Sequence, residues 1–273
     1  MSRAPILDHK DTDAPSVFEP AALLREARRQ KGLLTADVPA LCILDPDGDI
    51  VRHLKSSGQA RHSDKWPCYH TDLYEFMLAG ETAGIIGCAV GAPFAVLVAE
   101  ELFACGCRMV ISVTSAGQIE PVGDLPYYVV INRALRDEGT SYHYAPPEAF
   151  AEADPHVVAT AMHALTDKGL PAHVGASWTT DAPFRETSGA IAASRAEGLL
   201  TVEMEAAALY TFARKRNKAL LCLAHVTNAM GLAEGDFEKG EADGTTDTLT
   251  VLEALASAFN PINDPPLLRK SGP

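Results

Sequence analysis

The sequence predicts an α/β fold, and three observations support this prediction. The 273-residue chain is 47% hydrophobic and 22% charged, which is an ordinary globular composition of sufficient length for one large domain or two small ones. Residues 84–113 have the pattern of a strand, a glycine turn, a helix and a second strand, which is a βαβ unit. Residues 199–216 join a short apolar strand to an alanine-rich helix through two glutamates. Alternation of this kind indicates a sheet covered by helices.

Charge and cysteine content narrow the class of function. The net charge of -13 argues against a nucleic-acid partner or an anionic membrane, since either needs a basic surface. Small polar metabolites remain open as ligands. The six cysteines are scattered without a CxxC pair or the histidine spacing of a zinc site. We expect buried thiols of a reducing cytoplasm, with no disulfide and no structural metal.

The N-terminal third begins with a polar segment. Residues 1–18 carry aspartates and prolines without an apolar core, so we expect a flexible arm that can reach a neighbouring subunit, and no signal peptide. The segment Pro20–Lys31 is predicted to be a helix, with proline at its start, apolar residues at helical spacing and Gly32 as its stop. A short buried strand over 41–44 follows and ends in an acidic turn over 45–49.

Residues 55–81 do not have a regular pattern, and a strand followed by a turn and a hairpin is possible there. From residue 84 the pattern is clear: strand 84–89, turn 90–93, helix 94–105 and strand 109–113. The longest uncharged run, 83–99, is near the lower length of a membrane span. Its glycines and proline indicate a strand, a turn and a helix instead.

The second half continues the alternation. The expected elements, in order, are a strand over 125–135, a polar aromatic loop over 136–144, a helix over 155–168, a strand over 172–179, a loop over 180–187, a helix over 188–197, a strand over 219–227, a Gly- and acid-rich loop over 228–244 and a helix over 246–259. No repeat or linker divides the chain. We therefore expect one domain over 19–260 and a flexible tail over 261–273.

The two glutamates of the strand-to-helix junction are the first candidate site residues. Glu203 and Glu205 fall at the carboxyl end of a buried strand, the edge of an open α/β sheet where ligands bind. The alanines that follow suggest a helix packed closely on the sheet. A carboxylate there can accept two hydrogen bonds from a vicinal diol such as the 2′ and 3′ hydroxyls of ribose. Acids in a first helical turn can also merely complement the helix dipole, and the spacing alone leaves both explanations open.

Four motifs, taken in order, give the chain a family resemblance. They are Val-Gly-Ala-Pro at 90–93, Thr-Ser-Ala-Gly at 114–117, the loop 181–187 and Val-Glu-Met-Glu-Ala at 202–206. With these motifs the chain resembles nucleoside phosphorylases of the uridine phosphorylase and hexameric purine nucleoside phosphorylase type, a family that also contains nucleosidases. The resemblance covers roughly residues 83 to 230. It implies a single α/β domain with a mixed, partly closed central sheet flanked by helices. It also implies a homo-oligomer with sites near the subunit interface, and no cofactor besides inorganic phosphate as co-substrate.

The same resemblance assigns roles to residues of the nucleoside site. Glu205 would hold the ribose hydroxyls, Met204 would pack on the sugar and Glu203 would lie beside them. A nearby carboxylate suits this chemistry, because cleavage of an N-glycosidic bond passes through a cationic, oxocarbenium-like sugar. Phe184 matches the aromatic part of the base pocket, with a core phenylalanine as the alternative, and Arg185 would reach a carbonyl of the base.

Three further positions concern the leaving base and the backbone near the ligand. Asn228 falls where purine-cleaving members carry an aspartate that protonates the base. Since an asparagine cannot act as that acid but can hydrogen-bond a leaving group, it favours a pyrimidine nucleoside such as uridine. Ser115 keeps the residue type of the family, and Gly117 lets a ligand approach the backbone.

The chain departs from the family at the phosphate site. Phosphorylases carry a Gly-Asp-Pro-x-Arg loop after the first strand and an arginine in the later strand, whereas we read the first loop, 45–50, as lacking that arginine and find Ser112 at the second position. Losing two guanidiniums removes the contacts that hold a dianion. The nucleosidases have an acidic residue near this loop to activate water, and Asp47 or Asp49 matches it. Candidate replacement cations in the irregular segment or a neighbouring subunit are Arg52, Arg61, His62, Lys65 and His70.

Three functional hypotheses follow. The first is an enzyme that transfers the ribosyl group of a nucleoside to phosphate, and the second is a hydrolase that uses water at the same pocket. The third is a non-catalytic relative that binds a nucleoside or stores protein. A doubly wound nucleotide-binding enzyme would need a GxGxxG or Walker-type lysine motif, which the sequence lacks. The aromatic segments 136–144 and 62–74 further predict a homo-oligomer with these segments near the interface.

Overall fold

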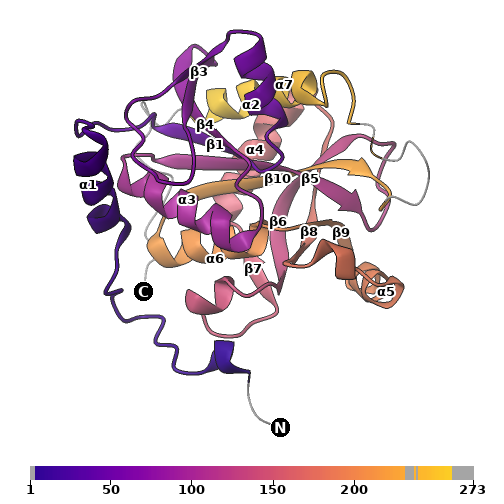
Figure 1. Cartoon of the computed structure of the whole chain (residues 1–273). Coiled ribbons are helices and arrows are strands. Elements are labelled where there is room, and N and C mark those ends of the chain that lie inside the picture. The colour runs from indigo at the N-terminus through magenta and orange to yellow at the C-terminus, as the bar shows by residue number, and fades with distance from the viewer. Residues whose placement is uncertain (1–3, 231–236, 238, 260–273) are drawn as a thin grey trace.

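A computed structural model describes residues 4–230, 237 and 239–259 of the chain. The helices are α1 Pro20–Lys31, α2 Asp49–Ser56, α3 Ala92–Ala104, α4 Pro155–Asp167, α5 Ser188–Ala196, α6 Ala206–Arg216 and α7 Thr245–Ala258, with short 3-10 turns η1 Pro5–Leu7, η2 Ser141–His143 and η3 Pro183–Arg185. The strands are β1 Leu41–Asp45, β2 Ala60–His62, β3 Tyr74–Leu78, β4 Glu81–Gly87, β5 Met109–Gln118, β6 Tyr127–Asp137, β7 Phe150–Glu152, β8 Ala172–Thr180, β9 Leu199–Glu203 and β10 Ala219–Asn228. Figure 1 shows how these elements are arranged.

The strands form one mixed sheet that closes on itself over part of its width. The order is β10-β6-β8-β9-β5-β1-β4-β3-β2, with β7 on β6, and β10 also pairs with β5. The five strands β5, β10, β6, β8 and β9 therefore make a closed ring, and β1, β4, β3 and β2 extend it as an open sheet. Parallel pairs such as β1 with β5 alternate with antiparallel pairs such as β10 with β6. The expected mixed, partly closed sheet is confirmed.

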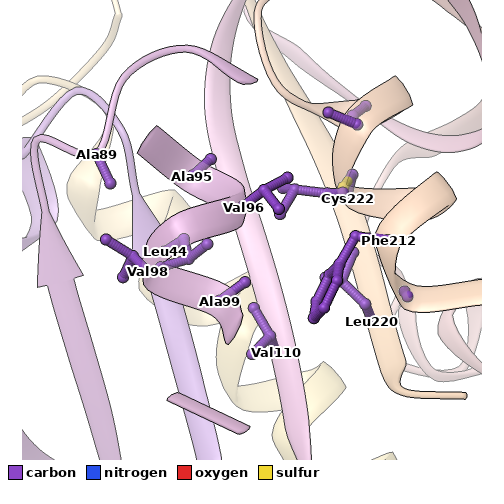
Figure 2. Packing of buried hydrophobic residues seen from close by; sticks show 14 of the residues in the cluster. Leu44, Ala89, Ala95, Val96, Val98, Ala99, Val110, Phe212, Leu220 and Cys222 are labelled. Carbon is purple, nitrogen blue, oxygen red and sulfur yellow. The ribbon is translucent and has the colours of Figure 1, made fainter. Parts of the chain in front are cut away.

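Helices cover the two faces of this sheet. On one face α3 packs against α6, and α1 packs on α3; on the other face α7 packs against α2 and α4. Figure 2 shows part of the first core, where Val96 and Ala99 of α3 and Phe212 of α6 belong to one buried cluster with Val110 of β5. The first residues of α6, Ala206 to Ala208, are buried. Small side chains thus let α6 lie close to the sheet, as its alanine content suggested.

The βαβ unit, the strand and hairpin considered possible in the irregular segment and most later elements are confirmed, and three features differ from the expectation. Strand β5 continues through 114–117, which the sequence placed in a turn, because β10 and β9 pair with it there. The acidic turn leads directly into α2, a helix that buries Ile50, Val51 and Leu54. Strands β2 and β3 occupy the irregular segment, with β3 antiparallel to β4. A short strand, β7, pairs with β6 after the aromatic loop.

The chain termini and the cysteines complete the description. The Lys10 ammonium donates to His143 Nδ1 at 2.9 Å, and Lys215 pairs with Asp13, so the described part of the arm lies against the domain. The predicted tail over 261–273 lies outside the described residues. Cys88 is exposed, which corrects the expectation that all six thiols are buried. In the described part of the chain no helix combines the length and the apolar character that a membrane span needs.

Candidate functional site

The candidate site is built around the junction of β9 and α6. Glu203 is the last residue of β9, and Glu205 precedes the first residue of α6. Strand β9 pairs with β8 on one side and with the end of β5 on the other. Both glutamates are buried, so their partners must come from the protein or from a ligand.

Glu203 has all of its hydrogen-bonding capacity used by the protein. Its Oε1 accepts hydrogen bonds from the hydroxyls of Ser177 and Thr179, at 3.1 and 2.5 Å. Its Oε2 accepts from the backbone N–H groups of Glu205 and Ala206, both at 2.7 Å. Burial raises the pKa of this carboxyl while these four donors oppose the shift. Glu203 therefore holds the start of α6, and a direct contact of this residue with the substrate stays a prediction.

Glu205 has one oxygen that is free for a ligand. Its Oε1 accepts the N–H of Gly91 at 2.7 Å, which ties the junction to the turn before α3. Its Oε2 is buried and has no partner within hydrogen-bond geometry among the described residues. The Thr114 hydroxyl donates to the carbonyl of Ser115 at 3.3 Å and also lies close enough to the Glu205 carboxyl to oppose the rise of its pKa. Burial and the charge of Glu203 raise the pKa of Glu205 to about 8. An unsatisfied acceptor that is only 1% exposed calls for a donor from a bound molecule.

Gly117, Asn228 and Met204 lie at the same edge of the sheet. Gly117 pairs with Val202 of β9 and with Asn228 of β10. A side chain at Gly117 would collide with the sulfur of Met230, so packing, rather than the approach of a ligand, explains this glycine. The Asn228 amide accepts from the Met230 N–H at 3.0 Å and donates to Thr227 at 3.3 Å. Met204 is half-buried between the two glutamates.

The structure does not bring Phe184 and Arg185 to the glutamates. Both lie in the exposed turn η3, and Phe184 is 99% exposed, so the alternative that it is a core residue is wrong. The adjacent Asp181 accepts the Gly139 N–H at 2.8 Å, which fixes the base of this loop. The binding of a base by Phe184 and Arg185 stays a prediction.

The acidic turn after β1 contains three aspartates with different partners. Asp45 accepts the N–H groups of Gly48 and Val51 at 3.1 and 3.0 Å, and burial raises its pKa to about 7. Asp47 reaches across to β5, where its Oδ2 accepts the Ser115 N–H at 2.8 Å. Asp49 pairs with Arg52 and accepts from the Lys239 ammonium at 2.6 Å. Arg52 and Lys239 thus place positive charge next to this acidic turn.

Two of these contacts correct the sequence analysis. Gly48, Asp49 and Arg52 stand at the spacing of the Gly-Asp-Pro-x-Arg loop, so the arginine we considered absent is present one turn into α2. Lys239 was not anticipated, because it is 190 residues from Asp49 in the sequence. The proposed replacement cations Arg61, Lys65 and His62 instead pair with Glu75, Glu75 and Asp72 near their own hairpin.

A small cavity lies behind the acidic turn. Its volume is about 20 Å³, and Asp47, Ser115, His225 and Thr245 are among the residues that line it. Burial and the nearby Lys239 charge lower the pKa of His225 to about 4, and its ring stacks on Tyr128 at 4.6 Å between centroids. Thr245 Oγ1 is buried without a partner in the described part of the chain. Ser112 does not line this cavity, and its Oγ is buried without a partner among the described residues, so its place in a phosphate or water site stays a prediction.

No metal centre is visible in the described residues, which contain no group of three or more His, Cys, Asp or Glu side chains placed to hold an ion. The chemistry available at the site is therefore that of carboxylates, amides, hydroxyls and two cations. The Oε2 of Glu205 can accept a hydrogen bond from a ligand, and the cavity beside Asp47 is lined by polar side chains.

Comparisons with known proteins bear on the family and the fold. A family model described as "Phosphorylase superfamily" matches residues 41–258. A uridine phosphorylase of Thermococcus kodakarensis is 31% identical over 185 residues, which cover 60% of this chain and 64% of the relative. A guanosine phosphorylase of Halorubrum lacusprofundi is 28% identical, covering 50% of this chain and 57% of the relative, and a uridine phosphorylase of Escherichia coli is 28% identical, covering 49% and 58%. The chain thus spans less than two thirds of the length of these curated relatives.

Solved structures share the fold at lower identity. A purine nucleoside phosphorylase from Toxoplasma gondii, crystallised with immucillin-H, superimposes with a TM-score of 0.70 at 18% identity, covering 82% of this chain and 92% of that one. A uridine phosphorylase from Vibrio fischeri superimposes with a TM-score of 0.69 at 22% identity, covering 82% and 95%. These matches concern the arrangement of the sheet and helices.

Proposed function

The chain belongs to the phosphorylase superfamily, and on this premise we propose that it is an enzyme that cleaves the N-glycosidic bond of a nucleoside. The observation that supports this most directly is the unpaired Oε2 of Glu205. A ribose hydroxyl supplies the donor that this atom lacks. Because hydrogen bonds and nearby positive charge favour the ionised carboxyl, the bound sugar also lowers the pKa of Glu205 from about 8.

The ionised Glu205 then suits the transition state. As the C1′–N bond breaks, its electron pair goes to the base and the sugar becomes oxocarbenium-like, with positive charge near the bound carboxylate. A buried carboxylate stabilises that charge without reorganisation of solvent. Glu203 contributes by fixing the backbone of Glu205 through its own two N–H contacts. The different roles of the two glutamates also argue against a storage protein, because a buried acceptor without a partner lowers stability and serves no purpose unless a ligand binds it.

Uridine is the first substrate we propose. Asn228 is at the edge of the sheet near Glu205, and its amide can donate to a carbonyl of the leaving base but cannot protonate a purine. The relatives named above include both uridine and guanosine phosphorylases, so the base is decided by the local chemistry of this chain. Phe184 and Arg185 would contact the base if their exposed turn closes over it.

Inorganic phosphate is the first acceptor we propose, and no other cofactor is needed. The relatives named above are phosphorylases, and Arg52 and Lys239 supply positive charge beside Ser115. In this reaction a phosphate oxygen bonds C1′, giving ribose 1-phosphate and the free base. Hydrolysis is the second candidate, because the carboxylate of Asp47 takes the Ser115 N–H and can act as a general base toward water.

We also propose a homo-oligomer, with the site near a subunit interface, in the cytoplasm. Two apolar side chains support the interface: Val90 is exposed in the turn whose Gly91 N–H donates to Glu205, and Phe184 is exposed in η3. Tyr142 and Tyr144 of the aromatic loop bond instead to Arg136 and Glu100 of the same chain. The interface is therefore proposed over the turns rather than over these two rings.

The test is product analysis on a nucleoside panel, with and without millimolar phosphate. Ribose 1-phosphate formed only with phosphate supports the first acceptor, and free ribose at an unchanged rate supports hydrolysis. Glu205→Ala serves as the variant without the ribose contact, and the exposed Glu253→Gln on α7 is the matched control. If purified wild-type protein cleaves no member of the panel, the proposal is wrong.

A further inference from the structure

The Ser115 N–H is the donor from which this inference starts. It lies near the carboxyl end of β5, and Asp47 Oδ2 accepts it at 2.8 Å. A backbone N–H directed at the edge of a sheet is a usual contact for an oxyanion. In this chain a side-chain carboxylate of the protein holds that contact.

The cations at the acidic turn over 45–49 are likewise paired with carboxylates of the protein. The Lys239 ammonium lies 2.6 Å from Asp49 and 3.7 Å from Asp47. Arg52 pairs with Asp49 and donates to the Asp47 carbonyl at 3.1 Å. Both cations that the described residues place here, Arg52 and Lys239, therefore already face a carboxylate of the acidic turn.

The contact of Asp47 is not needed to form the turn. Asp45 already closes it through the N–H groups of Gly48 and Val51, and Gly48 supplies the left-handed conformation, with φ of 76°, that starts α2. Asp47 is free to turn outward, since its side chain is only partly buried and, among the described residues, its carboxylate contacts the Ser115 N–H of another strand and the Lys239 ammonium.

The space beside Asp47 has the size of a water molecule. The cavity of about 20 Å³ exceeds the minimum of roughly 10–15 Å³ that one water needs, and a phosphate ion is several times larger than a water. Thr245 Oγ1, buried and without a partner in the described residues, lines this cavity and can bond a water there. With Asp47 in its present position, its carboxylate occupies the Ser115 N–H and repels an anion at this cavity, whereas a water molecule meets no such repulsion.

We propose that Asp47 is a built-in competitor for the acceptor anion, which occupies the Ser115 N–H and the Lys239 charge and so determines whether an oxyanion can enter. The inference rests on the proposed function, because the pocket is the acceptor site of that reaction. Phosphate, or an inorganic oxyanion of the same size, must displace the Asp47 side chain to bind, whereas water need not. The same residue thus makes phosphate binding weak and lets water compete.

The experiment is calorimetric titration of inorganic phosphate into four proteins: wild type, Asp47→Ala, Asp47→Asn and the control Asp167→Asn. Asp167 is an exposed acid on α4 whose loss changes the net charge equally. Freeing one charge-assisted contact and removing one repelling charge should tighten phosphate binding in Asp47→Ala by roughly tenfold to a hundredfold. Asp47→Asn should gain less, because its amide oxygen can still accept the Ser115 N–H. Thermal unfolding confirms that each variant is folded.

Phosphate binding is measured independently of nucleoside cleavage, so the inference about Asp47 and the proposed function can be refuted separately. If phosphate affinity of Asp47→Ala equals that of Asp167→Asn, Asp47 does not compete for the anion and the inference is overturned, whether or not nucleosides are cleaved. If affinity rises but no nucleoside is cleaved by wild type, the inference holds and the proposed reaction fails. With a cleaved nucleoside, the fraction of ribose 1-phosphate among the sugar products should rise in Asp47→Ala at fixed phosphate; an unchanged fraction would also count against it.

Discussion

Replacing Glu205 by glutamine tests whether the unpaired oxygen serves a ligand or merely the fold. Glutamine keeps an oxygen that can accept the Gly91 N–H, but it places an NH₂ group where the free Oε2 lies. A ribose hydroxyl then loses its charged acceptor. Loss of one charge-assisted hydrogen bond, about 1.5–3 kcal/mol, predicts a fall in kcat/KM of roughly 10- to 150-fold. Glu205→Ala should lose at least as much.

The same substitution, Glu205→Gln, should lower activity but raise the stability of the folded protein at high pH. The folded-state pKa of Glu205 is raised from 4.5 to about 8, so the folded protein retains a proton that the unfolded chain releases. The wild type therefore loses stability as the pH rises from about 4.5 to 8, by at most about 5 kcal/mol, because relaxation around the buried charge reduces the effect. Glutamine cannot ionise, so the free energy of unfolding of Glu205→Gln relative to wild type should increase between pH 6 and pH 9, by no more than about 3 kcal/mol.

The assay combines nucleoside cleavage with urea unfolding at pH 6 and pH 9, and Glu253→Gln is the exposed control. Cleavage within twofold of wild type would remove Glu205 from the site. A stability difference between Glu205→Gln and wild type that does not widen toward pH 9 would refute the raised pKa.

Three further predictions follow from the neighbouring contacts. Glu203→Gln should destabilise the fold by about 2–4 kcal/mol in urea unfolding, since two N–H groups of the α6 start lose a charged acceptor; unchanged stability would contradict this structural role. Asn228→Asp should raise the ratio of purine to pyrimidine cleavage by roughly tenfold, because a carboxyl can protonate a leaving base, and an unaltered panel profile would contradict this role. Sedimentation should show at least a dimer at micromolar concentration, weakened by Phe184→Ser; a wild-type monomer would reject the interface.

Local patterns in the sequence were sufficient for most elements of the fold. The βαβ unit over β4, α3 and β5 was predicted because apolar runs, glycines and a proline mark strand, turn and helix within a few residues of each other. Helix α2 was not predicted, because its local pattern is too short to recognise. The helix has only eight residues, and its apolar residues Ile50, Val51 and Leu54 have charged neighbours. A segment this short is hard to distinguish from a turn by its sequence pattern.

The sequence also located the candidate site, through the two glutamates at the end of β9, but it did not separate their roles. Both residues stand at the same strand end and have the same side chain. The difference arises from their partners: Glu203 accepts from hydroxyls of β8 and from the start of α6, while Glu205 accepts from the Gly91 N–H and keeps an oxygen without a partner among the described residues. Those partners come from other strands and turns, so only the tertiary structure shows that the hydrogen bonds of one glutamate are satisfied within the fold while the other keeps an unpaired oxygen among the described residues.

The acceptor pocket depended on tertiary structure still more. Asp47 and Ser115 are 68 residues apart, and Asp49 and Lys239 are 190 apart. They meet because β1 and β10 both pair with β5, which brings their carboxyl ends to one edge of the sheet. By itself the sequence determined that acids, small residues and a strand-to-helix junction exist at strand ends. Which of them touch was decided by the pairing of distant strands, because hydrogen bonds and ion pairs act over a few ångströms and not along the chain.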